Sequence, residues 1–409
     1  MAGNLRERLA RIKNSKKTED SRVCPKNQYP ALKTPGWSPA GSLTLRREVT
    51  IDAPSELQAV ISPSMAILVP DLRRIAETGK KLPAHGDFLF FDLETTGLSG
   101  GAGTVAFLAA FGRLSRNGSQ LRITQYLLLD YPGENDFLEA LLAEFKNNQQ
   151  IIVSFNGKSF DSQILKTRCL MNGIKNPEYL HADLLHPARR LWKRVFPNCR
   201  QGTIETELLG IDRSNDIPGS LAPEIWFDFL KTGREERLMG ICEHNCRDIA
   251  GLASILAAMN IIAADPCAAA AKYRYDLEQL ALYWRDFARH FKKSSIFGTE
   301  IVSLQETAAA LLRLAADKNY PQAAYVYALD QLRSADNNNG RNRMLNIAKG
   351  DFPQTTKAAA LRALAIDSER RLGDIAFALE FTEQGLKLQL TGTWQEEFER
   401  RAQRLEKKL

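Results

Sequence analysis

The spacing of apolar residues divides the chain into a part rich in strands and a part without them. Short apolar runs predict strands at residues 88–93, 105–113, 121–129, 151–155 and 179–184. Apolar positions at helical spacing predict helices at residues 135–147, 158–172, 187–196, 203–209, 222–231 and 235–260. Three strands joined by turns therefore precede strands that alternate with helices. This order predicts an α/β domain with a mixed sheet over residues 86–262.

The segments before this domain have a different pattern. Residues 1–47 contain scattered charges and prolines, and predict a short amphipathic helix near residues 4–14 followed by irregular, flexible chain. Residues 48–85 are expected to be a lead-in with a strand at 49–51 and a helix at 71–78.

The C-terminal part, residues 266–409, lacks strand signals and predicts an all-helical domain. Within it, residues 357–390 predict a helical hairpin that turns at Gly373 and Asp374. This hairpin fits a tetratricopeptide repeat only in part. A stack of helical hairpins, similar to tetratricopeptide repeats, is therefore the broader prediction.

Two acids stand at the end of the first predicted strand of the sheet domain, at Asp92 and Glu94. Because successive residues of a strand alternate between faces, both carboxylates point the same way. Two acids on one side of a core strand repel each other and resist burial, and a divalent ion bound through oxygen is a natural partner for both. Solvated acids at an ordinary strand end are the alternative.

Two later segments supply further carboxylates. Asp161, in the segment FNGKSFD, is expected in the first turn of a helix, where it binds a metal ion or serves as a capping acid. His244 and Asp248 are four residues apart and share one face of the helix predicted at 235–260, together with Leu252. A carboxylate beside an inward apolar stripe must be neutral, paired or metal-bound, unless it reaches water at the edge of the stripe.

The motifs FDLETTG, FNGKSFD and HNCRD, in this order, resemble the DEDD (DnaQ-like) exonuclease superfamily of the ribonuclease-H-like fold. The segments GLSGGAGTVAF and DIPGSLAPEIWFDFL resemble its YprB-like branch. The resemblance covers roughly residues 86–262. It implies a 3′→5′ exonuclease that acts on single-stranded DNA or RNA with two Mg²⁺ or Mn²⁺ ions, which would be held by Asp92, Glu94, Asp161 and Asp248.

One position departs from the superfamily pattern, which usually places Tyr four residues, or His five residues, before the last Asp. Here His244 occupies the Tyr position and Glu243 the His position. His244 could still orient or deprotonate the attacking water, because imidazole titrates in a suitable range. It could instead be a packing residue in a slow or inactive protein.

Five residues are candidates for contact with substrate. Thr95 and Gly97 follow the first acids in a glycine-rich turn that leaves room for a ligand backbone. Asn156 could hydrogen-bond substrate or a ligand carboxylate. Arg190 and Lys193 belong to a basic helical turn that could meet phosphates or could be solvated, and Trp192 beside them could stack on a base or lie in the core.

Composition changes the picture mainly at the N-terminus. The net charge is +7, yet residues 1–47 hold eleven Lys and Arg against three Asp and Glu, while the remaining chain holds 44 against 45. This tail could hold nucleic acid electrostatically or could be a solvated leader. No apolar stretch is typical of a membrane span or a signal peptide, which predicts a cytoplasmic protein with reduced cysteines.

Two other chemistries are disfavoured. Cys242 and Cys246 lie four residues apart on one amphipathic helix, and no second ligand pair stands at zinc-finger spacing, so packed thiols are expected. The glycine-rich turn after Thr95 lacks the Gly-Lys-Ser/Thr ending of a nucleotide P-loop.

Two functions from different classes fit these patterns. One is a metal-dependent nuclease, exonucleolytic by resemblance, although endonucleolytic cleavage would differ only in the size of the products. The alternative is a catalytically weak or inactive protein that binds nucleic acid or acts as a scaffold, in which the helical domain recruits a protein partner.

Overall fold

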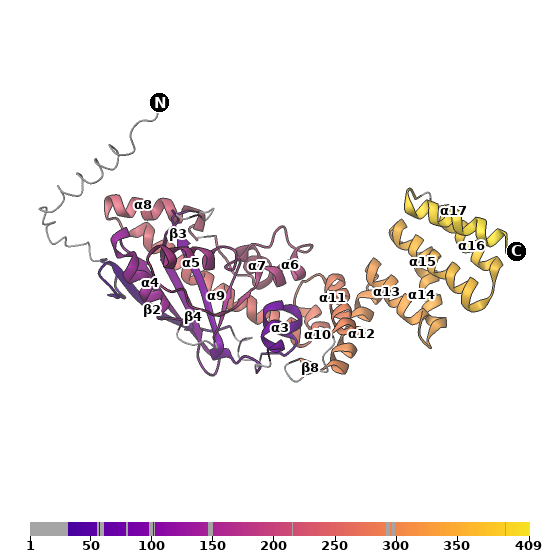
Figure 1. Ribbon diagram of the computed structural model, residues 1–409, viewed down its shortest axis with the longest axis horizontal. Coiled ribbons are helices and arrows are strands. Elements are labelled where there is room, and N and C mark those ends of the chain that lie inside the picture. Colours follow the sequence, from indigo (N-terminus) through magenta and orange to yellow (C-terminus); the bar gives the residue numbers. More distant parts are fainter. Residues whose placement is uncertain are drawn as a thin grey trace, which may run out of the picture.

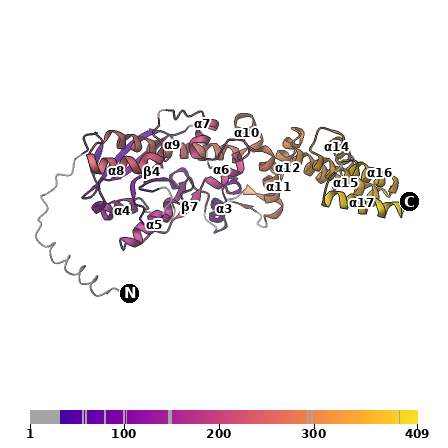
Figure 2. The same ribbon diagram turned by 90° about the horizontal axis from the view of Figure 1, so that it is seen from above.

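The computed structural model describes residues 32–54, 57, 61–78, 81–97, 101, 103–145, 150–214, 216–291, 295–296, 299–388 and 390–409. The helix predicted near residues 4–14 lies outside these residues. The described chain forms a sheet domain and a row of helices that extends away from it (Figure 1 and Figure 2).

A seven-stranded mixed sheet forms the centre of the described N-terminal half, with the strand order β1-β2-β5-β4-β3-β6-β7. The strands are β1 Trp37–Pro39, β2 Thr44–Asp52, β3 Phe88–Thr95, β4 Ala106–Leu114, β5 Gln120–Leu128, β6 Ile151–Ser154 and β7 Leu180–Asp183. Strands β3, β4 and β5 pair in antiparallel fashion, whereas β6 pairs with β3 and β7 pairs with β6 in parallel. The predicted mixed α/β sheet is confirmed.

Helices cover this sheet and continue beyond it. In the sheet domain they are α2 Met65–Leu68, α3 Pro70–Glu77, α4 Glu134–Leu142, α5 Asp161–Met171, α6 Leu185–Trp192, α7 Gln201–Leu209, α8 Ala222–Thr232 and α9 Glu236–Ala264. They are followed by α10 Pro266–Lys272, α11 Leu277–His290, α12 Ile301–Asp317, α13 Pro321–Leu332, α14 Asn337–Lys349, α15 Gln354–Asp367, α16 Ile375–Leu386 and α17 Thr393–Glu406. Figure 1 shows α14 to α17 at the end of the molecule farthest from the sheet.

The apolar residues of β3 alternate between the two faces of the sheet. Phe88 and Phe90 lie in the core that contains the C-terminal half of α9, whereas Leu89 and Phe91 lie in the core that contains α4 and α5. All four side chains are buried, because β3 has strands on both sides and helices over both faces. Asp92 continues the face of Phe88 and Phe90, so its carboxylate points toward α9.

Gly112 on β4 lets α9 approach the sheet closely. A Cβ atom at this position would lie 2.5 Å from Cγ2 of Ile249 on α9 and 3.2 Å from Cβ of Phe90. Only glycine therefore fits without a shift of the helix. One turn earlier on α9, Asn245 Oδ1 accepts a hydrogen bond of 2.9 Å from Gln125 Nε2 on β5. These contacts fix the part of α9 that carries His244 and Asp248.

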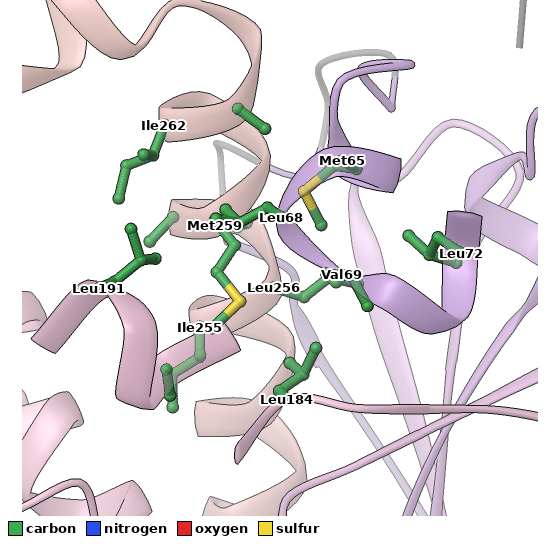
Figure 3. Close-up of a cluster of buried hydrophobic side chains, with 14 of the residues drawn as sticks. Met65, Leu68, Val69, Leu72, Leu184, Leu191, Ile255, Leu256, Met259 and Ile262 are labelled. Atoms are coloured by element: carbon green, nitrogen blue, oxygen red, sulfur yellow. The ribbon is translucent and has the colours of Figure 1, made fainter. Parts of the chain in front are cut away.

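Among the described helices, α9 alone is long and apolar enough to cross a membrane, but 67% of its most apolar window is buried. Figure 3 shows Ile255 and Met259 of α9 in the same buried cluster as Met65 and Leu68 of α2 and Leu191 of α6. Packing in the core of the domain therefore accounts for the apolar character of this helix.

The predicted boundary at residue 47 was wrong, because it falls inside β2. This strand pairs with β5 along its whole length and adds β1 outside it, so the sheet begins at Trp37. The strand predicted at residues 49–51 lies within β2, and the three consecutive charged residues Arg46 to Glu48 conceal its earlier part in the sequence. Arg47, for example, donates a hydrogen bond of 3.0 Å from Nε to Gln125 Oε1 on β5.

The C-terminal region also departs from two predictions. It was expected to lack strands, yet β8 Ser295–Ile296 and β9 Thr299–Glu300 form an antiparallel ladder. Strands of two residues are too short to produce a readable hydrophobic period. The domain boundary expected between residues 262 and 266 does not separate the cores either, because Trp284 of α11 and Leu311 of α12 share the core of α9.

A separate core is formed mainly by helices α13 to α17. The predicted hairpin over residues 357–390 is confirmed: α15 and a π-helical turn, Ser368–Leu372, end at Gly373, which has a φ of 70°, and α16 follows. Asp374 caps α16 by accepting a hydrogen bond from the amide of Phe377. The assignment as a tetratricopeptide-like repeat stays a prediction.

Candidate active site

The carboxylates of Asp92 and Glu94 stand near the C-terminal end of β3. Asp92 Oδ2 accepts a hydrogen bond of 2.7 Å from Asn245 Nδ2, which ties the strand to α9. Glu94 is only 9% exposed, and its Oε1 lies 3.9 Å from Nε2 of His244. The pairing register of β3 and β4 shifts between Glu94 and Thr95. Such an irregularity bends a strand at the place where its pairing ends.

Asp161 is the first residue of α5 and is buried. Its carboxylate accepts hydrogen bonds from the backbone of Leu93 on β3 and from its own backbone. Gly157 makes room for this arrangement, because a Cβ atom there would lie 2.9 Å from Asp161 Oδ2 and 2.5 Å from Ser154 Oγ. Asp161 therefore lies beside the strand that carries Asp92 and Glu94.

His244 and Asp248 lie on the face of α9 that is turned toward these acids. His244 Nε2 is 3.3 Å from Asp248 Oδ2. Potential ligand atoms of Glu94, His244 and Asp248 lie within 4.8 Å of one another, and no second group of this kind occurs in the part of the chain that the structure describes. Neither Cys242 nor Cys246 belongs to this group, which agrees with their predicted role as packed thiols.

The four acids repel one another in a partly buried site. Burial raises the pKa of Asp92 and of Glu94 well above the ordinary range, and the charges of Asp248 and Asp161 raise both further. Burial, together with the charge of Asp183, raises the pKa of Asp161 to about 7. A site of this kind favours either bound protons or bound cations. Because its donors are oxygens, hard divalent ions such as Mg²⁺ and Mn²⁺ fit it.

Sequence reasoning missed a second set of charged residues around His244. Asp216 Oδ2 lies 2.8 Å from His244 Nδ1 and 2.9 Å from Arg213 Nη1, and Asp216 Oδ1 lies 3.1 Å from Arg247 Nη1. Burial alone would raise the pKa of Asp216. The hydrogen bond with His244 and the charges of Arg213 and Arg247 outweigh burial and lower it. Asp216 is thus held ionised beside the imidazole.

Arg213 links this set to the four acids. Its Nη1 lies 2.6 Å from Asp248 Oδ1, and its Nε lies 2.5 Å from Oε2 of Glu205, a side chain with no exposed surface. Gly251 on α9 leaves space for Glu205, because a Cβ atom there would lie 1.7 Å from Glu205 Oε1. The sequence signal for this network was Asp216 as the first residue of DIPGSLAPEIWFDFL, but the resemblance of this segment assigned no role to Asp216 or Arg213.

The loop that follows Asp216 covers the histidine. A Cβ atom on Gly219 would lie 3.0 Å from His244 Nε2 and 3.8 Å from Glu94 Oε1. Glycine at this position therefore leaves the imidazole in close contact with the loop backbone and still open toward the acids.

Three predicted substrate residues lie on turns near the strand ends. Thr95 donates a hydrogen bond of 2.8 Å to the carbonyl of Gly97, which holds the turn after β3. Asn156 is exposed and adopts a φ of 69°, and its amide donates a hydrogen bond of 2.8 Å to Asp183 Oδ1. Asp183 also accepts hydrogen bonds from the amides of Lys158 and Leu185, so it organises the turn that precedes Asp161.

The basic turn on α6 divides into structural and exposed residues. The guanidinium of Arg190 lies 3.8 Å from the ring centroid of Tyr283 and donates a hydrogen bond to the carbonyl of Leu68, so it joins α6 to neighbouring helices. Trp192 is fully buried. Lys193 is exposed. Of these residues, only Lys193 has the accessibility that phosphate binding requires.

Comparisons with known proteins agree with this geometry. A family model described as the RNase_H superfamily matches residues 89–260. The uncharacterized protein YprB of Bacillus subtilis (strain 168) is 40% identical over 172 residues, which are 41% of this chain and 41% of that protein. The uncharacterized protein MJ0365 of Methanocaldococcus jannaschii is 30% identical over 167 residues, which are 39% of this chain and 86% of that protein.

This chain is a YprB-like member of the ribonuclease H superfamily. The residues matched by the superfamily model run from β3 into α9, so they include all four acids and His244 and leave out α10 to α17. The similarity spans less than half of the YprB protein. The ribonuclease H relationship therefore describes the sheet domain.

Proposed function

We propose that this protein is a metal-dependent nuclease that hydrolyses phosphodiester bonds of single-stranded DNA or RNA. One observation carries the proposal: ligand atoms of Glu94 on β3 and of His244 and Asp248 on α9 lie within 4.8 Å of one another, and two further acids from β3 and α5 lie beside them. Structural roles alone do not account for such a concentration of buried negative charge beside a histidine. The acids are Asp92, Glu94, Asp161 and Asp248.

Two Mg²⁺ or Mn²⁺ ions held by these four carboxylates would activate the attacking water and neutralise charge on the leaving oxygen. The fit rests on the donor set, which offers several oxygens in a site where burial and repulsion disfavour four free anions. The chain itself supplies the positions of the acids through the bend in β3, the first turn of α5 and the close packing of α9 on Gly112.

His244 is the proposed general base. Its Nε2 faces Glu94 and Asp248, where the attacking water would lie, and Nδ1 is engaged by Asp216. If Nδ1–H donates to Asp216, Nε2 is left as the proton acceptor, and the negative charge of Asp216 stabilises the imidazolium that forms. The unusual position of His244 relative to Asp248 is compatible with this role, because one helical turn places both side chains on the same face.

The finer assignment is a 3′→5′ exonuclease of the DEDD type, and this rests on the resemblance of the motifs. Thr95, Gly97 and Asn156 are proposed to line the substrate beside the acids, and Lys193 to contact phosphate farther away. Arg190 is not part of this proposal, since its guanidinium is occupied by Tyr283 and Leu68.

The proposal is tested with single-stranded DNA and RNA oligonucleotides labelled at either end, incubated with Mn²⁺ or Mg²⁺. Wild-type protein should release nucleotides stepwise from the 3′ end, and the Asp92→Ala/Glu94→Ala variant should release none. Glu243→Gln is a matched control, because this exposed acid neighbours His244 without facing the site. Equal release by wild type and the double variant would assign the activity to a contaminant.

A second candidate function, an inactive binding or scaffold protein, is favoured by one contact. Arg213 Nη1 lies 2.6 Å from Asp248, so a guanidinium occupies a position at which an ion would bind. In that case titration calorimetry would detect no Mn²⁺ binding, and the helices α13 to α17 would carry the function by recruiting a protein partner. A cytoplasmic location stays a prediction in both cases.

A further inference from the structure

Two adjoining hollows lie between the sheet domain and the helical region. The smaller, of about 200 Å³, is bordered by Ile211, by Ser254 and Ala258 of α9, and by Tyr273. The larger, of about 410 Å³, is bordered by Tyr273 again and by Arg274, Lys318 and Tyr320. Tyr273 stands between the two hollows and borders both, and we call the surface along them the junction strip: Ile211, Ser254, Tyr273, Arg274, Lys318 and Tyr320.

The junction strip begins beside the candidate active site. Ile211, which is 36% exposed, stands two residues before Arg213, and Arg213 contacts Asp248 at 2.6 Å. Along α9, Ala258 follows Asp248 by ten residues, a rise of about 15 Å. Figure 2 shows α9 running lengthwise from the sheet toward α10, so the strip follows this helix away from the acids.

The far end of the junction strip is cationic. Arg274 and Lys318 are both exposed, and Lys272 Nζ lies 5.0 Å from the ring centroid of Tyr273. The guanidinium of Arg274 lies 5.5 Å from the ring centroid of Phe196, and its ion pair with Glu207 is long, at 3.7 Å, and exposed, a type of contact that contributes little and is easily exchanged. No ion pair of Lys318 occurs within the described part of the chain. Arg274 and Lys318 are therefore available to an anionic ligand.

A neighbouring arginine has a different role. Arg194 borders the larger hollow, but its guanidinium pairs with Asp276 at 2.7 Å and with Glu278 at 3.0 Å, and both of these acids are buried. Glu278 also accepts hydrogen bonds from the first amides of α13. Arg194 thus stabilises the packing of α11 against α13. This packing supports the side of the larger hollow that Lys318 and Tyr320 form.

We propose that the junction strip binds the part of a single-stranded nucleic acid that extends away from the scissile phosphate, with phosphates on Arg274 and Lys318 and a base on Tyr320. The inference rests on the proposed nuclease function. Exposed cations next to an aromatic ring suit phosphates alternating with bases, and Tyr320 is 37% exposed. An acidic peptide would also pair with the cations. It contains no phosphodiester bond, however, so it would not extend into a site that cleaves such bonds.

The geometry sets a length requirement. A stacked strand advances about 3.4 Å per nucleotide, so more than about four nucleotides are needed to reach from Asp248 past Ala258 to the cations. A substrate of about three nucleotides would occupy only the acids, whereas one of about 12 would also occupy the strip.

The experiment compares hydrolysis of these two lengths by wild type, Arg274→Glu/Lys318→Glu and Tyr320→Ala. We expect both variants to raise KM for the long strand about fivefold or more, with kcat and the short substrate unchanged. The charge variant should also flatten the dependence of affinity on salt by about one unit of slope per lost phosphate contact. Lys387→Glu, at the end of α16, is the matched control and should behave as wild type.

Binding is measured separately by fluorescence anisotropy of the labelled long strand with Ca²⁺ in place of Mg²⁺. Equal affinity of wild type and both strip variants for the long strand would overturn the strip. Binding of a labelled acidic peptide that is lost in Arg274→Glu/Lys318→Glu, with the affinity for the strand unchanged in that variant, would overturn the choice of nucleic acid. If wild-type protein hydrolyses neither the short nor the long strand, the nuclease assignment is wrong. The anisotropy measurement would still show whether the junction strip binds the long strand.

Discussion

Asp216 Oδ2 lies 2.8 Å from His244 Nδ1, although the two residues stand 28 positions apart in the chain. Asp216 is in turn contacted by Arg213 and Arg247, so its carboxylate is fixed on one side of the imidazole. The arrangement orients Nε2 toward Glu94 and Asp248. A carboxylate in this position selects the tautomer and orientation of the ring and does not need to touch substrate.

Asp216→Asn should therefore lower kcat by about 10² to 10⁴-fold, because an amide can favour the wrong tautomer of His244. KM for oligonucleotides and the affinity for Mn²⁺ should change little, since Asp216 is not among the four acids. Steady-state kinetics and titration calorimetry measure these quantities. The ¹⁵N chemical shifts of the His244 ring report its tautomer independently of activity. An unchanged tautomer together with an unchanged kcat would show that Asp216 does not position His244.

The contribution of Asp92, Glu94 and Asp161 to the stability of the metal-free protein should decrease as pH rises. Burial and like charges raise the pKa of Asp161 to about 7 in the folded state, and raise the pKa values of Asp92 and Glu94 as well. Below about pH 4 both folded and unfolded chains are protonated at Asp161. Between about pH 4 and pH 7 the unfolded chain releases a proton that the folded chain retains, so the free energy of unfolding falls.

Thermal unfolding in EDTA, scanned from acid to neutral pH, measures this effect. Asp161→Asn should flatten the curve, because it removes the ionisation of one of these acids. Mn²⁺ should raise Tm more at pH 8 than at pH 5, because cations then replace the lost protons. A difference in Tm between wild type and Asp161→Asn that does not change in this direction between pH 4 and pH 7 would contradict the raised pKa of Asp161.

Arg213→Ala should destabilise the fold by about 3–5 kcal/mol, because it leaves the fully buried Glu205 without its cation. The second change Glu205→Gln should recover part of this loss. Urea denaturation measures both effects. Arg237→Ala is the control: its pair with Glu224 is exposed, and its loss should cost less than about 1 kcal/mol. Equal effects of the two arginine variants would show that Arg213 is not a structural cation.

Gly251→Ala tests the packing behind Arg213. The added Cβ would lie 1.7 Å from Glu205 Oε1, so Glu205 must move and the fold should lose about 1–3 kcal/mol. Gly202→Ala on α7 is a matched control, since its Cβ would meet no atom within 4 Å. We expect Gly202→Ala to be neutral or stabilising in the same denaturation assay. A tolerated Gly251→Ala would indicate that Glu205 can reorient freely.

Local periodicity accounts for the parts of the fold and the candidate site that sequence could predict. The alternation along β3 places Asp92 and Glu94 on one face, and helical spacing places His244 beside Asp248. Both relationships depend on residues within one element. Strands β3 to β7 were found for the same reason, because buried strands produce apolar runs.

Contacts between elements that are far apart in the sequence could not be predicted from the sequence. The network around His244 includes Glu205 from α7 and Arg213 and Asp216 from the loop after it. These side chains meet His244 and Asp248 only when α9 packs against both segments. Arg190 looked available for phosphate, but Tyr283 from a distant helix occupies its guanidinium. The strand predicted at residues 49–51 lies within β2, but its first half was not predicted, because only pairing with β5 marks Arg46, Arg47 and Glu48 as part of a strand.

A crystal soaked in Mn²⁺ shows directly whether Asp92, Glu94, Asp161 and Asp248 converge on bound cations. Anomalous scattering should reveal two ions in contact with these carboxylates, with Arg213 withdrawn from Asp248 to admit them. Crystals that show no anomalous peak beside Asp92 and Glu94 at saturating Mn²⁺, with Arg213 still bound to Asp248, would contradict the account.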